Sequence, residues 1–200
     1  MTTAAGDTPY SDPIAWFRAA FAEAEKGEAF DPARAALATL GADSQPTVRF
    51  VLVKELDDRG FVFFTNYRSP KAEHVAAHPE AALAFHWASV GIQVRVEGTV
   101  ERLDTSASDR YFASRPRGSQ LGAWASEQSN PIADRAALDA RFAETEARFE
   151  GQEVTRPAFW GGYRVIPRCI EYWQSRDSRL HDRWSFRRVA DGWQVQRLQP

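Results

Sequence analysis

Hydrophobic residues recur along the chain with two different periods, and each period predicts a type of element. Those that follow Asp12-Pro13 have helical spacing, and the pair itself is a typical N-cap and first helical residue. Residues 48–53 instead alternate between two faces and are rich in β-branched side chains, as in a strand. A turn at 57–60 and a returning strand at 61–65 complete a predicted β-hairpin.

The rest of the chain is predicted to mix short strands with helices. In chain order we expect a helix at 71–77, strands at 81–87 and 92–101, helices at 104–114 and 134–149, and short strands within 163–198 separated by turns at Pro167, 175–178 and 191–192. Residues 35–40 form only a short apolar run before a turn-like segment. Strands in runs, without regular βαβ alternation, favour a mainly β fold, an antiparallel barrel or sandwich with peripheral helices.

Length and composition indicate one globular domain. The chain has 200 residues, no internal repeat and no Pro- or Gly-rich linker, so we expect a single domain over 12–200 after a flexible tail at 1–11. Hydrophobic residues make 44% and aromatic residues 12%, which excludes disorder as the dominant state. The N-terminus shows no basic segment followed by an apolar one, so no secretory signal is expected.

Charge and cysteine usage exclude several classes of protein. A formal net charge of -2 argues against a general binder of nucleic acid or of anionic membranes. The longest uncharged run, 81–94, is too short to span a bilayer. The single cysteine, Cys169, excludes an internal disulfide and a Cys-rich metal site. We therefore expect a cytoplasmic protein with no nucleic-acid or membrane partner.

Common catalytic and metal-binding signatures are missing from the sequence. It has no P-loop, no Gly-x-Gly-x-x-Gly turn, no HExxH and no Gly-x-Ser-x-Gly. His74 and His78 are spaced as a helical metal pair, but no third ligand follows at a suitable distance. Two solvated surface histidines are the favoured interpretation, and we expect no metal.

Four clusters of cations and amides lie near aromatic residues. In the first, Arg49 and Lys54 stand at the ends of the strand 48–53, with an odd spacing that puts them on opposite faces of a regular strand. A strand with solvated ends is the alternative there. The second, Thr65 to Lys71, is a loop that leads into a helix, where hydroxyls, backbone N–H groups and the ammonium can hold a phosphate.

The third cluster spans 111–129. Tyr111 and Arg115 share a helix face at a spacing of four residues. The polar residues of the loop predicted to follow are Arg117, Ser119, Gln128 and Ser129.

In the fourth cluster, Arg179, His181 and Arg183 are predicted to alternate along one face of a strand. Asp182 points the other way and does not offset them, so the grouping costs free energy unless an anion or an electron-rich ring lies there. A surface strand whose cations point into water is the alternative.

Together the four clusters suit a phosphorylated planar ligand. Arginine binds phosphate in a bidentate manner, and aromatic or guanidinium planes stack on a ring. No carboxylate pair and no Ser-His-Asp order emerges, which favours an organic cofactor as the source of the chemistry.

Five motifs resemble, in family order, those of the pyridoxamine 5'-phosphate oxidase family. They are Arg49–Lys54, Phe63–Asn66, Gln93–Gly98, Tyr111–Gln120, and Glu171–Gln174 followed by Arg179–Arg183. The resemblance runs from about Asp31 to Pro200.

The resemblance implies a split β-barrel that binds FMN and forms a homodimer with the FMN at the subunit interface. The implied reaction oxidises pyridoxamine 5'-phosphate or pyridoxine 5'-phosphate to pyridoxal 5'-phosphate, with O2 as acceptor and H2O2 as product. The implied cofactor-binding residues are Arg49, Phe50, Val51, Leu52, Val53, Lys54, Phe64, Thr65, Lys71, Gln93, Gln128, Ser129, Trp173 and Arg183. The implied substrate-binding residues are Lys54, Tyr111, Arg115, Ser119, Arg179, Leu180 and His181, of which Arg179 and His181 lie against the pyridine ring as the catalytic pair.

Two features depart from the family pattern. Pro70 stands between Ser69 and Lys71, where the family usually has an arginine, and Arg68 is the candidate replacement for that cation. Residues 1–11 contain Tyr10 but no arginine, whereas the family usually has a longer N-terminal segment that covers the substrate.

Two alternatives stay open at this point. One is a related flavin oxidase of another aromatic metabolite, as in phenazine-type secondary metabolism. The other is a non-catalytic protein that binds flavin or pyridoxal phosphate. Tyr111, Arg115 and Ser119 favour the phosphorylated substrate.

Overall fold

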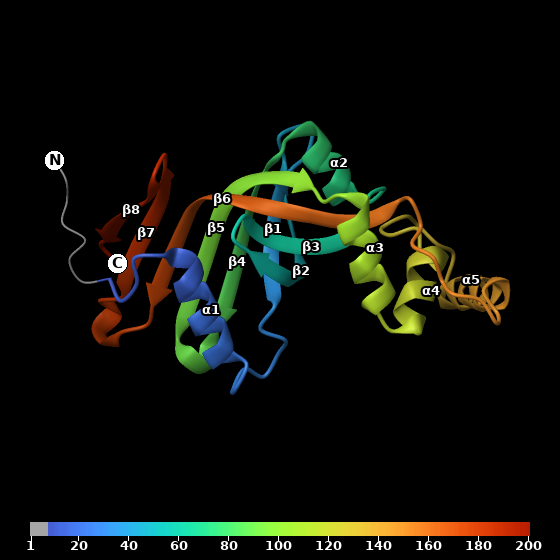
Figure 1. Ribbon diagram of the computed structural model, residues 1–200, viewed down its shortest axis with the longest axis horizontal. Coiled ribbons are helices and arrows are strands. Elements are labelled where there is room, and N and C mark those ends of the chain that lie inside the picture. Colours follow the sequence, from blue (N-terminus) through green and yellow to red (C-terminus); the bar gives the residue numbers. More distant parts are fainter. Residues whose placement is uncertain (1–7) are drawn as a thin grey trace.

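The computed structural model describes residues 8–200, and all its strands join one antiparallel sheet (Figure 1). The strands are β1 (Arg34–Leu40), β2 (Pro46–Asp57), β3 (Gly60–Asn66), β4 (Glu80–Trp87), β5 (Ile92–Arg102), β6 (Trp160–Gln174), β7 (Asp182–Val189) and β8 (Gly192–Leu198). The helices are α1 (Pro13–Ala24), α2 (Pro70–Ala77), α3 (Thr105–Ser114), α4 (Arg117–Ala125) and α5 (Arg135–Arg148), with 3-10 turns η1 (Ala88–Val90) and η2 (Asp177–Arg179).

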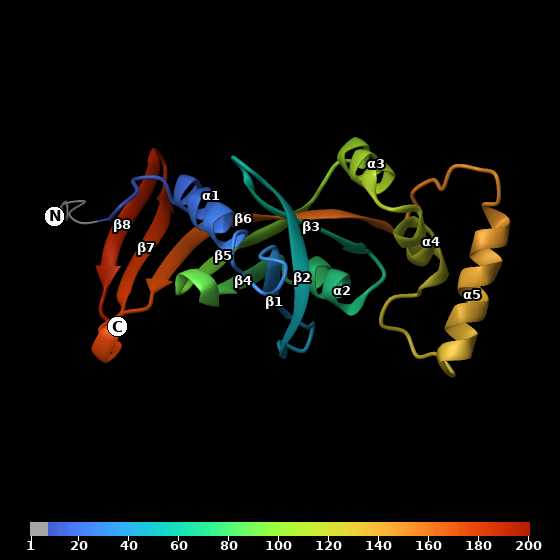
Figure 2. The same ribbon diagram turned by 90° about the horizontal axis from the view of Figure 1, so that it is seen from below.

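The sheet closes on itself to form a barrel. Its order is β3-β2-β1-β4-β5-β6-β7-β8, and an additional pairing of β3 with β6 closes the strands β1 to β6 into a ring. The hairpin of β7 and β8 continues the sheet beyond the barrel, at the end of the molecule opposite to α3, α4 and α5 (Figures 1 and 2). The predicted mainly β barrel with peripheral helices is confirmed.

β6 is a single long strand, so the predicted turn at Pro167 is wrong. Gly98 pairs with Pro167 and Glu97 with Cys169, which leaves Arg168 as an extra residue in a β-bulge. A bulge interrupts the hydrogen-bond ladder, so a proline without an N–H is tolerated there. Gly98 faces the bulge closely, since a Cβ at this position would lie 1.9 Å from the carbonyl oxygen of Ile166.

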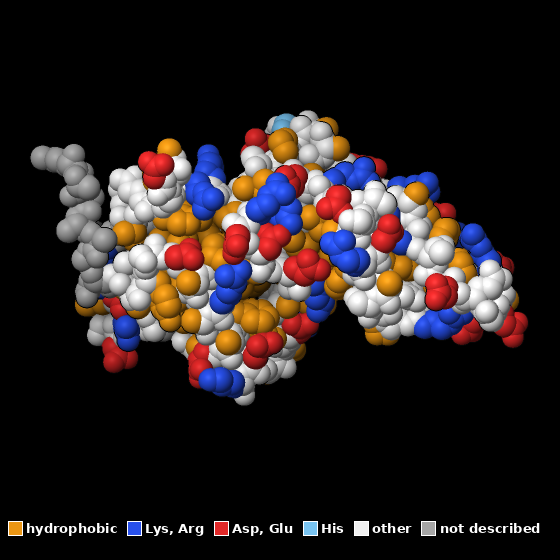
Figure 3. All heavy atoms as spheres, in the orientation of Figure 1, with side chains coloured by type: hydrophobic (Ala, Val, Ile, Leu, Met, Phe, Trp, Pro, Cys, Tyr) orange, Lys and Arg blue, Asp and Glu red, His pale blue; other side chains and the backbone are white. Residues whose placement is uncertain are grey.

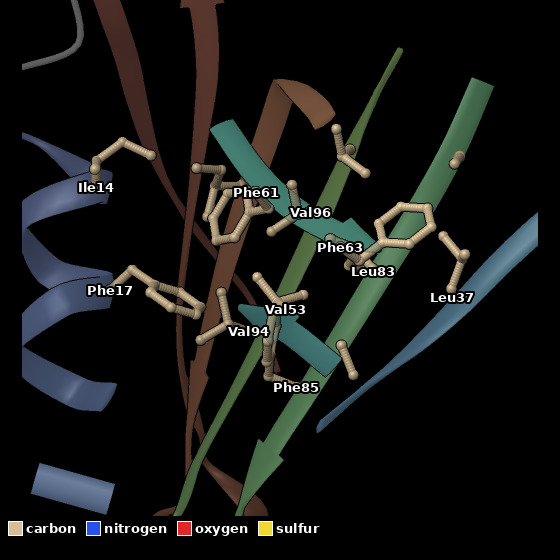
Figure 4. Close-up of a cluster of buried hydrophobic side chains, with 14 of the residues drawn as sticks. Ile14, Phe17, Leu37, Val53, Phe61, Phe63, Leu83, Phe85, Val94 and Val96 are labelled. Carbon is tan, nitrogen blue, oxygen red and sulfur yellow. The ribbon is translucent and has the colours of Figure 1, made fainter. Parts of the chain in front are cut away.

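The barrel core is completed by α1. Asp12 caps this helix as predicted, its carboxylate accepting from the N–H groups of Ile14 and Ala15. Phe17 inserts its ring 4.9 Å from those of Phe61 and Phe85, among the buried side chains shown in Figure 4.

At the β7 end of the molecule, α1 is held by aromatic stacking. Trp16 stacks on Tyr172 of β6 with 3.9 Å between ring centroids, and Tyr10 stacks on Trp16 at 5.7 Å. Residues 1–7 of the predicted tail lie outside the described residues, while Tyr10 packs against the core.

Two further elements differ from the prediction. Residues 35–40, expected only as a short apolar run, belong to β1, which pairs with both β2 and β4. Pro116 ends α3 as predicted, but α4 begins at the next residue, so the polar loop expected to hold Arg117 and Ser119 is wrong. A proline breaks the preceding helix yet is accepted at the start of a new one, where no intrahelical N–H bond is needed.

The surface carries both signs of charge. On the face shown in Figure 3, basic and acidic side chains are interspersed with apolar ones. Within residues 8–200, none of the helices combines the length and the apolar character that a membrane span requires.

We predict that Gly98→Ala destabilises the fold by about 1–3 kcal/mol or more, because the new methyl group overlaps the backbone of β6 at the bulge. Gly122→Ala in α4 is the matched control, since a Cβ there meets no atom within 4 Å. It should stabilise by about 0.5–1 kcal/mol through helix propensity. Thermal melting of both variants measures these effects. An unchanged melting temperature for Gly98→Ala would contradict the close approach of Gly98 to the backbone of β6.

Candidate functional site

Most of the expected barrel-side residues surround one cavity, which we call the barrel pocket. Its volume is about 270 Å³, and it opens where β2, β3, α2 and α3 meet. The residues that line it are Phe50, Val51, Leu52, Lys54, Phe64, Thr65, Lys71, Tyr111, Arg115, Gln128 and Trp160. All but Trp160 were predicted.

One wall of the barrel pocket is aromatic. The rings of Phe64 and Tyr111 stack 3.7 Å apart and within 10° of parallel, and Trp160 lies 5.7 Å from Phe64, also at 10°. The guanidinium of Arg115 lies over the Trp160 ring, 4.6 Å from its centroid. Trp160 is outside the motifs, and only its pairing with Asn66 across β3 and β6 brings it to the site.

The pocket is also lined by a buried ammonium. Lys71, in the first turn of α2, is only 9% exposed. Its Nζ donates to Gln128 Oε1 at 2.7 Å, to Ser69 Oγ at 3.0 Å and to Thr65 Oγ1 at 3.1 Å, all neutral oxygens. Burial and the nearby charge of Arg49 lower the pKa of Lys71 to about 8. A bound anion would offset the free energy that this charge costs.

Arg115 has donors ready for a ligand. Its Nη1 is buried and has no hydrogen-bond partner within residues 8–200. Burial lowers the pKa of Arg115 and raises the pKa of the neighbouring Tyr111. Lys54 reaches the same pocket from β2, and its Nζ lies 3.3 Å from a carboxylate oxygen of Asp31. The cations Arg115 and Lys54 beside the aromatic wall suit a ligand that has a phosphate and a planar ring.

Four other predicted residues lie around the pocket without lining it. Arg49 donates to the Leu37 carbonyl oxygen at 3.0 Å and to Thr39 Oγ1 at 2.7 Å. Val53 is buried in the barrel core, while Ser119 and Ser129 are exposed.

The region around Pro70 shows how the departure from the family pattern is accommodated. Pro70 starts α2, directly after Ser69. Arg68, the candidate replacement cation, stacks over the ring of Phe159 at 4.7 Å and does not line the barrel pocket. His74 in the same helix lies 3.1 Å from Thr39 Oγ1 through Nδ1, and within the described chain no three potential metal ligands converge.

The remaining predicted residues form a second group, which we call the strand row. Gln93 of β5 pairs with Trp173 of β6, and Trp173 pairs with Arg183 of β7, so the three stand side by side on one sheet face. Glu171, to which the sequence analysis assigned no role, holds the arginines of this face in place. Its carboxylate accepts from Arg183 Nη2 at 2.8 Å and from Arg95 Nη2 at 2.6 Å.

The predicted alternation of Arg179, His181 and Arg183 along one strand is wrong at its start. Ser178 and Arg179 have positive φ values of 55° and 60°, and β7 begins only at Asp182. Local turn bonds form instead, with the Leu180 N–H donating to the Asp177 carbonyl oxygen at 3.1 Å. His181 nevertheless joins the strand row, because its ring packs 4.3 Å from that of Trp173.

The barrel pocket and the strand row lie at opposite ends of β6. Trp160 belongs to the pocket and Trp173 to the row, and the strand runs continuously between them (Figure 1). At about 3.3 Å per residue, the separation along the strand is roughly 40 Å. One small ligand therefore cannot touch both groups within a single chain.

Comparison with protein families gives two matches. A family model described as pyridoxamine 5'-phosphate oxidase matches residues 22–149, and one described as pyridoxine 5'-phosphate oxidase C-terminal dimerisation region matches residues 160–200. The strand row lies mostly within the second region.

Individual proteins of similar sequence carry the same name. The chain is 54% identical over 189 residues to the pyridoxine/pyridoxamine 5'-phosphate oxidase of Thermosynechococcus vestitus, covering 94% of this chain and 89% of the relative. It is 55% identical over 189 residues to the protein of that name from Anaeromyxobacter dehalogenans, covering 94% and 96%.

Solved structures share the fold. PhzG from Burkholderia lata, in complex with tetrahydrophenazine-1-carboxylic acid, has a TM-score of 0.91 at 31% identity and covers 97% of this chain and 95% of its own. An FMN-binding protein from Nostoc punctiforme, related to pyridoxamine 5'-phosphate oxidase, has a TM-score of 0.75 at 14% identity, covering 98% and 100%, and shows the fold alone.

We predict that the affinity of the cofactor-free protein for FMN falls above pH 8. The pKa of Lys71 is about 8 without an anion, and an anion favours its charged form. Affinity is therefore full below that pH and decreases above it, by up to about tenfold for each pH unit. Fluorescence titrations between pH 7 and 9.5 measure it.

Two controls accompany this titration. Riboflavin, which has no phosphate, should show no such decrease, and Lys71→Met should remove it from FMN binding. A pH dependence equally steep for riboflavin would show that Lys71 does not contact the phosphate.

Proposed function

The chain belongs to the pyridoxamine 5'-phosphate oxidase family, and from this premise we propose that it oxidises pyridoxamine 5'-phosphate and pyridoxine 5'-phosphate to pyridoxal 5'-phosphate. It is an enzyme with FMN as cofactor. In the proposed reaction O2 takes up two electrons and two protons to give H2O2. The amine substrate also consumes water and releases ammonia, whereas the alcohol substrate needs neither. The observation that carries the proposal is the barrel pocket, where three cations, one with a donor that has no partner within the described chain, line the same cavity as the three rings of the aromatic wall.

The residues of the barrel pocket fit a phosphorylated flavin. Lys71 holds a buried positive charge among Thr65, Ser69 and Gln128, whose oxygens it can exchange for those of a phosphate. The flavin supplies the acceptor for the two electrons that leave the substrate. The chain's own contribution is to bind, to orient and to exclude water, which is the usual division of labour in a cofactor enzyme.

A second phosphate, that of the substrate, fits the other cations of the pocket. Arg115 and Tyr111 project from the end of α3, and Lys54 approaches from β2. The buried Nη1 of Arg115 supplies a donor that the fold itself leaves without a partner within the described chain. Planar stacking against the pocket's aromatic wall would hold the pyridine ring near the cofactor.

We infer that two copies of the chain share each site. The strand row, with Arg179 and His181 beside it, lies too far along β6 to reach the pocket of its own chain. β2 presents an apolar stripe to the outside, with Val48 70% and Phe50 72% exposed beside the pocket. A partner that covers this stripe would bring its own strand row to the pocket, in keeping with the dimerisation region matched at 160–200.

The phenazine-type alternative rests on the likeness to PhzG at a TM-score of 0.91. Identity to that protein is 31%, against 54% and 55% to two pyridoxine/pyridoxamine 5'-phosphate oxidases. The ligand named with PhzG carries a carboxylate and no phosphate. Two separate groups of cations in the barrel pocket favour a phosphorylated substrate here, and an H2O2 assay with pyridoxamine 5'-phosphate tests the choice.

Arg115→Ala should raise the KM for pyridoxamine 5'-phosphate about tenfold or more, because a charge-assisted hydrogen bond contributes roughly 1.5–3 kcal/mol. FMN content, read from flavin absorbance, should change little. Arg110→Ala is the control, since this arginine lies on the exposed face of α3 and bonds to Ser106. An unchanged KM for Arg115→Ala would remove this residue from the substrate site.

Mixing two impaired variants tests whether the site is shared, with activity measured at a pyridoxamine 5'-phosphate concentration well below the KM of Arg115→Ala. Arg115→Ala damages the barrel pocket and His181→Ala the strand row, so each homodimer has two damaged sites. Random exchange of subunits gives mixed dimers with one intact site, and we predict recovery to about a quarter of wild-type activity. No recovery, with exchange verified by mass spectrometry of differently tagged chains, would place both groups in one chain's site.

A further inference from the structure

We propose that the backbone N–H of Arg176 holds neutral His181 in its Nε2–H tautomer, so that His181 serves the site as a hydrogen-bond donor and not as a base. Only the identity of the acceptor rests on the proposed function. The tautomer itself is a property of the loop between β6 and β7.

The key contact is a hydrogen bond from the Arg176 N–H to His181 Nδ1, with 3.2 Å between the nitrogens. A peptide N–H only donates, so Nδ1 must present a lone pair. A neutral imidazole has one protonated nitrogen and one bare nitrogen, and the proton must then be on Nε2. The opposite tautomer would direct two N–H groups at each other.

Both partners of this bond are fixed in place. Arg176 Nε donates to Asp182 Oδ2 at 2.6 Å, and the preceding N–H, of Ser175, donates to the Gly91 carbonyl oxygen at 2.9 Å. The His181 ring packs against Trp173, with centroids 4.3 Å apart and planes tilted by 41°. The loop is therefore organised before any ligand binds, and a flip of the ring would break the bond to Nδ1.

The chemical consequence concerns the other ring nitrogen. Nε2 makes no hydrogen bond within the described chain, and in this tautomer it offers an N–H. Such a group binds an electron-rich oxygen or nitrogen of a substrate and cannot remove a proton from it. His181 would thus fix one substituent of the substrate ring, while the Arg176 peptide acts as the positioning group behind it.

The first test reads the tautomer directly. Long-range ¹⁵N–¹H correlation spectra of the FMN-bound protein, labelled at its four histidines, distinguish a bare nitrogen from a protonated one. A His181→Gln variant assigns the signal, and the spectrum is recorded where it no longer changes with pH. We expect a bare Nδ1 and a protonated Nε2. A protonated Nδ1, or an average of the two tautomers, would overturn the proposal.

The second test removes the N–H. Arg176→Pro deletes the N–H and the guanidinium and also moves φ from −140° toward the value of about −65° that proline requires, whereas Arg176→Ala deletes only the guanidinium. The alanine variant should keep the Nε2–H tautomer, and the proline variant should show an average and a further fall in kcat/KM of about two- to tenfold. If the proline variant retains the tautomer, the N–H is not its cause. If that variant does not fold, the wild-type spectrum decides.

Side-chain replacements test the donor role. Glutamine places an amide NH2 where Nε2 stands, and asparagine mimics only the Nδ1 side of the ring. His181→Gln should therefore retain more kcat/KM than His181→Asn, and the reverse order would contradict a donor at Nε2. Failure of this proposal can be distinguished from failure of the proposed function. The tautomer is measured without substrate. Absence of turnover with both pyridoxamine 5'-phosphate and pyridoxine 5'-phosphate would contradict only the proposed function.

Discussion

The pairing of β6 with three other strands determines how far the barrel pocket lies from the strand row. Its first part pairs with β3 and closes the barrel, residues 163–174 pair with β5, and its last part pairs with β7. Trp160 and Trp173 are therefore held at the two ends of one rigid, hydrogen-bonded strand. Because the sheet is continuous, the separation between the barrel pocket and the strand row cannot be closed by a local movement. Completion by a second chain is the arrangement that this constraint favours.

Within the barrel pocket, the protein maintains charge that the fold does not neutralise. Lys71 is buried among neutral oxygens, and Arg115 keeps a buried donor unused within the described chain. Each lowers the stability of the protein without a ligand, since burial disfavours an ammonium or guanidinium. A phosphate offsets that free energy on binding. The same buried charges would therefore lower the stability of the free protein and raise its affinity for phosphorylated ligands.

The strand row is organised differently. Its cation Arg183 is held by Glu171, and Arg176 of the adjoining loop is held by Asp182. Paired groups have fixed directions, which suits a surface that orients a ligand. The bond from the Arg176 N–H to His181 extends this principle to an uncharged group. In the proposed enzyme the pocket would supply most of the affinity for anions, and the row most of the orientation of the ligand.

The sequence alone was sufficient to predict the elements that depend on interactions between residues close together in the chain. Helical spacing behind Asp12 predicted α1 and its cap, and the turn at 57–60 predicted the hairpin of β2 and β3. The motifs also predicted nearly all of the residues around the barrel pocket, because these residues must bear specific donors or rings whatever the geometry.

Only the tertiary structure decided the features that depend on a distant partner. Pro167 stays within β6 because Gly98 of β5 leaves room for a bulge, and Trp160 enters the site because β3 lies beside it. Arg179 lies outside β7 because residues 177–180 form a turn, in which the Leu180 N–H donates to the Asp177 carbonyl oxygen. The periodicity of hydrophobic residues indicates which face of an element is buried. It does not indicate which strand will pair with a given strand. The pairing of strands determines both the shape of the barrel pocket and its distance from the strand row.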